Sequence, residues 1–268
     1  MAFLLLVIVA QVAIAFVVGT LVGMQRVGAQ STMLLQVSLQ LVAAVVATAI
    51  MLRSIDVRPW SDVGMDRSAV RPRVLLEGWL LGGAAIAIAC GVLFAAGWLR
   101  IQPGPDGSSI SAAFSLTFFL IIAALAEELL SRGYLLTTLR DGLGAATAVA
   151  VTSVLFGAAH LRNTGVTVQS ICIVTLAGVF LGAIRLSFQS VYASTAAHAA
   201  WNWVLAVGFH ASVSGIQFDA PDYRTVEQGP DWLTGGQWGP EGGLAAALGM
   251  LGVLAYLHRT RLRRREES

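Results

Sequence analysis

Charged and amide side chains interrupt three apolar stretches of this 268-residue chain. Inside a membrane such groups are costly, and by default they mark candidate functional sites. They occur in three short patterns: Glu127-Glu128-x-x-x-Arg132, Phe156-x-x-x-His160 and His198-x-x-x-Asn202. A spacing of four places both members of a pair on one helix face, so Glu128 and Arg132 can pair. Glu127 is rotated by about 100° from Glu128 and needs a different partner.

Two kinds of hydrolytic chemistry suit these residues. In the first, Glu127 is a general base acting on a water molecule that His160 helps to hold. His198 and Asn202 then donate hydrogen bonds to the oxyanion of a tetrahedral intermediate. In the second, Zn²⁺ activates the water and is bound by Glu127, His160 and His198. No H-E-x-x-H motif accompanies this second set.

Each pattern also has a purely structural explanation. The first can be a charge cluster that reaches water at a helix end, the second a helix-end anchor, and the third a source of hydrogen bonds between helices. The patterns nevertheless fall at similar depths when 1.5 Å per residue is counted from the expected turns. Glu127 and His160 lie about 21–24 Å from the expected turn at residues 141–144, which projects some way out of the membrane, and the third pattern lies about 12–18 Å in from the same side. This agreement favours a shared site.

Other classes of membrane protein fit these residues poorly. Ser131 and Ser153 have no evident base, and the chain shows no rhomboid-type serine motif within a span. The aspartates lie in expected loops or turns, which disfavours a presenilin-type aspartyl pair. Repeated halves with broken helices are not evident, which disfavours a transporter.

The elements that must hold these residues are membrane-spanning helices. Hydrophobic residues make up 56% of the chain and charged residues 12%, and the mean hydropathy is +0.75. This composition excludes a cytosolic globular enzyme, a disordered chain and a disulfide scaffold, and the net charge of +2 gives no reason to expect nucleic acid as a partner. We predict an all-α, polytopic transmembrane helix bundle with about eight spans. The spans are expected at residues 2–24, 32–52, 74–99, 112–140, 145–161, 166–186, 190–210 and 243–257.

The spans fall into three expected regions. Residues 1–110 form an N-terminal three-span region with an Arg-rich loop, residues 111–210 a catalytic helical core, and residues 211–268 an acidic loop, the last span and a basic tail. Arginines gather at residues 53–73 and 259–265, whereas residues 211–242 are acidic. The positive-inside rule therefore predicts a multi-pass plasma-membrane protein with both termini in the cytoplasm.

Two further features concern how the helices are retained and packed. The first span lacks the charged n-region of a cleaved signal peptide, which favours its retention. Small-x-x-x-small pairs predict close helix packing within the bundle, with a dimer face as the alternative. These pairs are Gly19/Gly23, Gly78/Gly82 and Gly178/Gly182.

In order and spacing, the three polar patterns resemble the CPBP family over residues 112–205. This family comprises the type II CAAX prenyl endopeptidases and bacterial relatives linked to bacteriocin processing or immunity. The resemblance implies an intramembrane endopeptidase of the glutamate type. Its base position falls on Glu127, with His160 as partner on the water, and its oxyanion positions fall on His198 and Asn202. The remaining motif positions support the site: Glu128, Arg132 and Phe156.

The resemblance also sets expectations for cofactors and partners. It implies no cofactor, although the family has also been described as metalloproteases, which leaves the zinc alternative open. The expected partners are the lipid bilayer and a peptide or protein substrate, either prenylated and CAAX-like or bacteriocin-like. A non-catalytic immunity or scaffold protein that binds a peptide through the same cavity is the alternative function. The sequence leaves the oligomeric state open.

Overall fold

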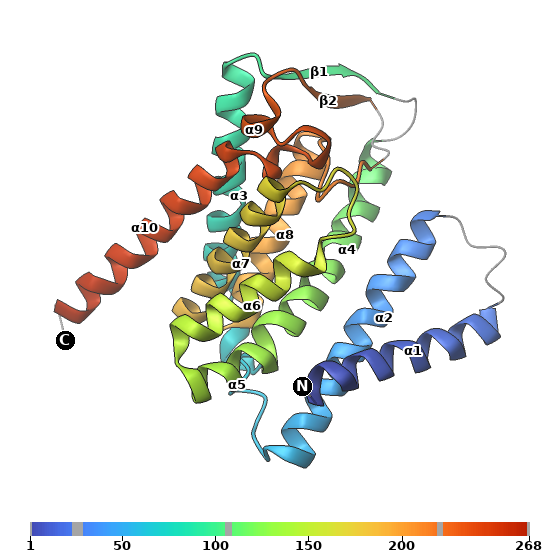
Figure 1. Ribbon diagram of the computed structural model, residues 1–268, viewed down its shortest axis with the longest axis vertical. Helices are drawn as coiled ribbons and strands as arrows, with labels where there is room; N and C mark the ends of the chain where they lie inside the picture. The colour runs from blue at the N-terminus through green and yellow to red at the C-terminus, as the bar shows by residue number, and fades with distance from the viewer. Residues whose placement is uncertain (1, 23–28, 105–108, 219–221, 267–268) are drawn as a thin grey trace.

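The computed structural model describes residues 2–22, 29–104, 109–218 and 222–266, with side chains described for 2–13, 32–104, 110–218 and 222–260. Helices dominate these residues, and Figure 1 shows them gathered into a bundle with a small sheet at one end. The longer helices are α1 (Ala2–Val22), α2 (Ala29–Ile50), α3 (Pro72–Ala95), α4 (Ser109–Glu128), α5 (Tyr134–Leu143), α6 (Ala145–Ala159), α7 (Val168–Phe188), α8 (Val191–Trp203) and α10 (Leu244–Glu266). The remaining elements are η2 (Met51–Ile55), η3 (Arg67–Val70), β1 (Leu99–Pro103), η4 (Leu129–Gly133), η5 (Val204–Gly208), β2 (Tyr223–Glu227), α9 (Asp231–Thr234), η6 (Gly236–Trp238) and η7 (Pro240–Gly242).

Among the described residues, four helical stretches are long and apolar enough to cross a bilayer: Thr32–Ile55, Pro72–Ala95, Ile110–Leu143 and Val168–Phe188. Three shorter apolar stretches with described side chains are Ala2–Ala13 of α1, Ala145–Ala159, which is α6, and Leu244–Thr260 of α10. The protein is therefore a helical membrane protein, but the predicted count of about eight full spans is not supported. Length is the physical reason, because α6 has 15 residues and α8 has 13. Such helices are about 20–23 Å long, against roughly 30 Å of hydrocarbon.

Three of the predicted spans reach π-helical turns: the second ends in η2, and the fourth and seventh contain η4 and η5. The fourth begins as α4, passes through the π-helix η4 and continues as α5, so the helix runs on to Leu143. The seventh changes from α8 to the π-helix η5 after Trp203 and stops at Gly208. Such turns hold one more residue than an α-helical turn and are frequent at functional sites. In this chain η4 overlaps the first polar pattern, because it contains Arg132, and η5 begins shortly after the third pattern, which ends at Asn202.

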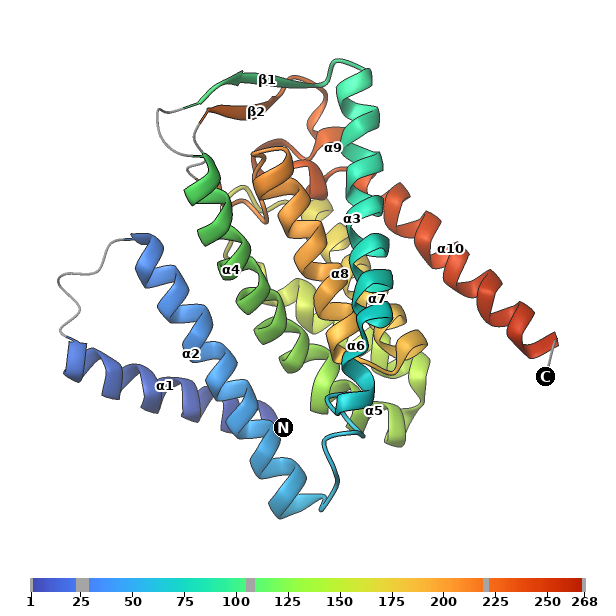
Figure 2. The same ribbon diagram turned by 180° about the vertical axis from the view of Figure 1, so that it is seen from behind.

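Close helix packing within the bundle, the interpretation favoured for the small-x-x-x-small pairs, is confirmed for two of the three. A Cβ atom on Gly82 of α3 would lie 2.0 Å from the carbonyl oxygen of Ala197 on α8. A Cβ atom on Gly178 of α7 would lie 2.7 Å from Ser153 on α6. Figure 2 shows α3 running along α8 in this arrangement. The pair that includes Gly23 lies outside the described residues.

A small antiparallel sheet of two short strands accompanies the helices of the otherwise helical fold. Strand β1 pairs with β2 in a register that sets Leu99 opposite Glu227 and Pro103 opposite Tyr223. We call the described parts of residues 211–242 the cap segment, which contains β2, α9, η6 and η7. The Gln169 side chain at the start of α7 donates hydrogen bonds to the carbonyls of Trp232 (2.8 Å) and Gly242 (2.9 Å). The cap segment is thus fastened to the helices at the end where the sheet lies (Figure 1).

The N-terminal helices α1 and α2 pack on each other and contact the rest of the bundle through α4, η4 and Tyr134. The Tyr134 hydroxyl donates a 2.7 Å hydrogen bond to Asp56, and its ring lies 5.0 Å from that of Phe3. A separate and larger hydrophobic core joins α3, α7, α8 and α10. The polar patterns lie in and beside this larger core.

Candidate active site

The three polar patterns, which are far apart in the sequence, meet in the structure. Glu127 and Glu128 end helix α4, His160 stands at the C-terminal end of α6, and His198 lies on α8. Helices α4, α6 and α8 converge because α8 packs against both α3 and α4, while α6 packs against α7. The structure therefore brings together side chains that the sequence places in one site.

Glu128 is the centre of a fully buried charged network. One of its oxygens, Oε1, lies 3.1 Å from Arg132 Nη1 and 3.1 Å from His198 Nδ1. The Glu128 and Arg132 side chains are both 0% exposed, so the predicted pairing is confirmed. Arg132 also donates to the carbonyl of Gly178 (3.1 Å) and lies 4.3 Å from the centre of the Phe156 ring. Every member of the network is thus held in one orientation.

The partner that Glu127 was expected to need is His198. A carboxylate only accepts hydrogen bonds, so His198 donates through Nδ1 to Glu128 and turns Nε2 toward Glu127. The distance from Nε2 to Glu127 Oε2 is 3.9 Å. The Glu127 side chain is 33% exposed, in contrast to its neighbour. Its Oε2 atom is buried and has no hydrogen-bond partner among the described residues.

His160 is oriented by its own helix. Its Nδ1 lies 2.8 Å from the backbone carbonyl of Phe156, which can only accept, so Nδ1 carries the proton. In the neutral ring, Nε2 is then left as an acceptor for water. The Phe156 ring lies 4.9 Å from the His160 ring and 5.9 Å from the His198 ring. Phe156 therefore spaces the two histidines, as its supporting position implies.

A cavity of about 40 Å³ lies between these helices, enough for a few water molecules. His160, His198 and Asn202 all line it, and Asn202 has no side-chain hydrogen bond to any described residue. Glu127 is not part of the lining, and the described contact between it and the site is the one to His198. The other lining residues are Phe156, Val174, Ala177, Phe180, Leu181, Trp201, Ser214 and Glu241.

Glu241 is a site residue that sequence reasoning missed. It belongs to the cap segment, is only 7% exposed, and lines the same cavity as the two histidines. Its Oε2 accepts a 2.7 Å hydrogen bond from the Trp201 indole, and its Oε1 accepts from the backbone N–H (2.5 Å) and hydroxyl (2.8 Å) of Ser214. The residues around Glu241 are turn-forming glycines and a proline, so the local pattern predicted an exposed loop and carried no signal for burial.

The proposed zinc ligands do not form a metal-binding group in this structure. The described part of the chain contains no cluster of three His, Cys, Asp or Glu side chains placed to hold a metal ion. The contact of His198 Nδ1 with Glu128 leaves Nε2 as the one nitrogen that could bind a metal. In the described residues, Glu127, His160 and His198 are not placed around one common point.

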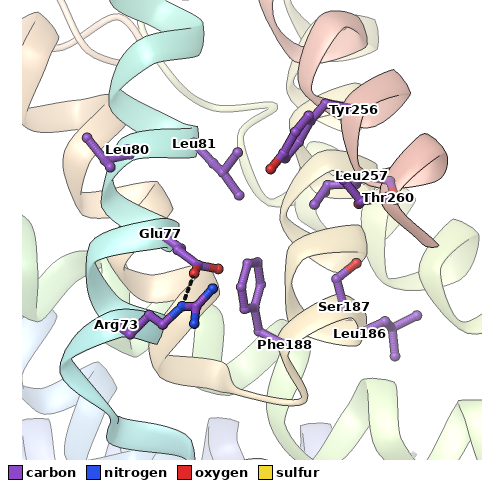
Figure 3. Close-up of a pocket in the computed structure, with 10 residues that line it drawn as sticks. All are labelled: Arg73, Glu77, Leu80, Leu81, Leu186, Ser187, Phe188, Tyr256, Leu257 and Thr260. Atoms are coloured by element: carbon purple, nitrogen blue, oxygen red, sulfur yellow. Dashed lines mark hydrogen bonds and ion pairs between the residues drawn. The ribbon is translucent and has the colours of Figure 1, made fainter. Parts of the chain in front are cut away.

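A larger pocket of about 440 Å³ lies away from these residues, between α3, the end of α7 and α10 (Figure 3). Apolar side chains such as Leu81 and Phe188 border it, and the ion pair Arg73–Glu77 (2.6 Å) stands at one end. None of the residues from the three polar patterns lines it. This pocket is therefore separate from the candidate active site, although it is larger than the cavity there.

Comparison with known proteins agrees with the resemblance drawn from the motifs. Residues 109–204 match the family model described as type II CAAX prenyl endopeptidase Rce1-like. This segment contains all three polar patterns but not the cap segment. A comparison with curated proteins finds no match. Residues 109–204, about a third of the chain, are therefore similar to the type II CAAX prenyl endopeptidases, which supports the resemblance to the CPBP family.

Proposed function

We propose that this protein is an intramembrane endopeptidase that hydrolyses a peptide bond of a membrane-associated substrate. The family supports a peptidase in general terms. The single observation that carries the more specific proposal is the pairing of Glu127 with His198 Nε2 at 3.9 Å, beside a water-sized cavity lined by His160 and Asn202. A partly exposed carboxylate next to fixed imidazoles is the arrangement that general-base hydrolysis requires.

Glu127 takes a proton from a water molecule that His160 Nε2 helps to hold. The resulting hydroxide attacks the carbonyl carbon of the substrate, and the carbonyl oxygen becomes an oxyanion. The proton on Glu127 then passes to the amide nitrogen as the carbon–nitrogen bond breaks, which releases an acid and an amine. No other reactant is needed, because water supplies both the hydroxide and the proton.

His198 and Asn202 stabilise the oxyanion in this proposal. Because Nδ1 of His198 donates to Glu128, Nε2 can donate only when the ring is an imidazolium. Glu128 at 3.1 Å and Glu127 at 3.9 Å supply the negative charge that favours this form. The Asn202 amide, which lines the cavity without a partner in the described residues, is free to supply the second donor.

We further propose that the reaction needs no metal, that the substrate is a prenylated CAAX-like or bacteriocin-like peptide, and that both termini face the cytoplasm at the plasma membrane. The first point is supported by the placement of Glu127, His160 and His198, which are not grouped around one common point in the described residues. The family resemblance supports the second. The Arg-rich stretches at 53–73 and 259–265 support the third.

The test compares wild type with Glu127→Gln in detergent-purified full-length protein. Substrates are a farnesylated CAAX peptide, the same peptide without the farnesyl group, and a hydrophobic bacteriocin-type peptide. We expect Glu127→Gln to lower kcat/KM by about 10²- to 10⁴-fold, because a general base contributes on this scale. The matched control is Glu77→Gln, which removes a carboxylate from an ion pair outside the cavity and should leave cleavage unchanged.

A zinc chelator forms the second arm of this experiment. Cleavage that requires Glu127 and ignores the chelator supports the proposal. Cleavage that the chelator abolishes and zinc restores would replace it with the metal mechanism. Undiminished cleavage by Glu127→Gln, or biological function that survives loss of both Glu127 and His160, would favour a protein that binds its peptide without cutting it.

A further inference from the structure

Glu241 is buried beside the candidate active site although it lies outside the segment that matches the family. A buried carboxylate without compensation is strongly unfavourable. No described cation pairs with Glu241. Its hydrogen-bond donors are instead the neutral groups of Trp201 and Ser214. The Trp201 hydrogen bond connects the cap segment with α8, whereas the two hydrogen bonds from Ser214 lie within the cap segment.

The Trp201 contact affects the helix that carries His198 and Asn202, the two proposed oxyanion donors. Trp201 lies on α8 between His198 and Asn202 and is only 6% exposed. The Trp201 ring lies beside the Phe180 ring of α7, with the ring centres 6.1 Å apart. Its indole N–H donates a 2.7 Å hydrogen bond to Glu241. Holding this indole resists rotation of α8 about its axis, and such a rotation would turn both neighbours away from the cavity.

The Ser214 contact is linked to His160 through Asn163. The carbonyl of Ser214 accepts a 2.9 Å hydrogen bond from the side chain of Asn163, and the backbone N–H of Asn163 donates to the carbonyl of His160 (3.1 Å). The next residue, Gly215, donates to the carbonyl of Trp238, whose ring lies 6.3 Å from that of His160. The hydrogen bonds to Ser214 thus extend to the turn that carries His160.

We propose that Glu241 is a positioning residue, which joins α8 to the turn after α6 so that Asn202 and His160 face one cavity. Glu241 acts through Trp201 and Ser214 and takes no part in the proton transfers. The catalytic consequence rests on the proposed peptidase function, whereas the contact itself does not. Because the cap segment lies outside the family match, this device belongs to the present chain rather than to the matched segment.

The kinetic test uses Glu241→Gln, Trp201→Phe and the double variant. Glutamine keeps the size of the side chain but replaces one acceptor oxygen with an NH₂ group. Because Oε1 accepts two hydrogen bonds from Ser214 and Oε2 accepts one from Trp201, the NH₂ group should take the Oε2 position, and the Trp201 indole then loses its acceptor. We expect kcat to fall by about 10- to 100-fold, with a much smaller change in KM, because small displacements of reacting groups act mainly on kcat. The double variant should be no slower than the slower single variant, because both changes break the same contact.

Glu227→Gln is the matched control, because Glu227 is another partly buried carboxylate of the cap segment and does not line this cavity. Its kcat should equal that of wild type. An unchanged kcat in Glu241→Gln, or losses in the two single variants that add fully, would overturn the proposal. Trp201→Phe alone decides the point if Glu241→Gln fails to fold, since it removes the indole N–H and keeps an aromatic ring.

A second readout is independent of activity. The chain has seven tryptophans, and Trp201→Phe identifies the indole N–H resonance of Trp201 in ¹⁵N-labelled protein. Glu241→Gln should shift this resonance, and Glu227→Gln should not. Absence of a shift would overturn the proposed contact. If wild type cleaves none of the peptides, the proposed function fails, while the indole resonance still decides whether Glu241 holds Trp201.

Discussion

Glu128 and Glu241 are two buried carboxylates beside one cavity, and they are stabilised by different means. Glu128 is held by Arg132, one helical turn away, and by His198. Glu241 is held by neutral donors that come from α8 and from its own cap segment. The first arrangement depends on charge and the second on the number of hydrogen bonds. The two carboxylates should therefore respond very differently to the loss of one partner.

The largest expected effect is on the Glu128 side. Arg132→Met leaves a buried carboxylate without its cation, which costs about 3–5 kcal/mol. Thermal unfolding in detergent should show a large drop in Tm. The double variant Glu128→Gln/Arg132→Met should recover much of this loss, because it removes the charge that was left unpaired. A double variant no more stable than Arg132→Met would contradict the importance of charge at this site.

A smaller loss of stability is expected at the contact between α3 and α8, because α8 supplies a partner to both Glu128 and Glu241. Gly82→Ala would place a Cβ atom 2.0 Å from the carbonyl of Ala197, so α3 and α8 must separate. The expected cost is about 1–3 kcal/mol, as for other overpacked sites, together with reduced activity because α8 carries both His198 and Trp201. Gly91→Ala on the same helix is the control, because its Cβ would meet nothing within 4 Å. Equal Tm values for the two variants would contradict the close contact.

The Glu241 side should tolerate the loss of one donor. Ser214→Ala removes the hydroxyl that lies 2.8 Å from Glu241 and leaves the backbone N–H and the Trp201 indole in place. We expect a loss of about 1.5–3 kcal/mol in stability, the range for one hydrogen bond to a charged group. Ser212→Ala, whose hydroxyl pairs with Gln217 at an exposed position, is the comparison. A loss as large as that of Arg132→Met would remove the distinction between the two carboxylates.

The smallest expected effect is a pH dependence of stability that comes from a third carboxylate, Glu227. Burial raises the pKa of Glu227 from its ordinary value of 4.5 to about 7, with Asp231 adding to the rise and Thr234 and Gly236 opposing it. The folded protein therefore keeps this proton to higher pH than the unfolded chain does, so stability falls as pH rises from 4.5 to about 7. Because the group is partly exposed, we expect a change of about 1 kcal/mol.

The measurement is the difference in Tm between wild type and Glu227→Gln at about pH 5 and about pH 8, which isolates this one group. Wild type should lose stability relative to the variant at the higher pH. Identical pH dependence in the two proteins would show that Glu227 titrates as an exposed carboxylate.

The same contrast explains how much of the site could be predicted from the sequence. The Glu128–Arg132 pair is local, and a spacing of four on a helix was enough to predict it. The close approach of α3 and α8 was likewise visible, because Gly78 and Gly82 recur on one helix face. The bond between Glu241 and Trp201 joins residues 40 positions apart through a cap segment without helical periodicity, so no local pattern could predict it.

Element lengths were predicted less well than element types. Hydropathy does not distinguish a helix that crosses the membrane from a short apolar helix such as α6 or α8, since both read as apolar. The contact of His198 with both carboxylates was also not predicted, because it depends on how α4 and α8 cross. The roles of Glu127, His160, His198 and Asn202 in catalysis stay predictions.

The π-helical turn η4 decides where the chain can change in length. Its five residues, 129–133, separate Glu128 at the end of α4 from Tyr134, which contacts Phe3 and Asp56. A π-helical turn holds one residue more than an α-helical turn, so deleting Ser131 would restore an α-helical turn and leave Tyr134 on nearly the same side of the helix. Arg132 would then follow Glu128 by three positions, a spacing that still allows the pair. A deletion within α5 would instead rotate the residues on its two sides by about 100° relative to each other, so loss of a residue should be accepted more readily at Ser131 than in α5.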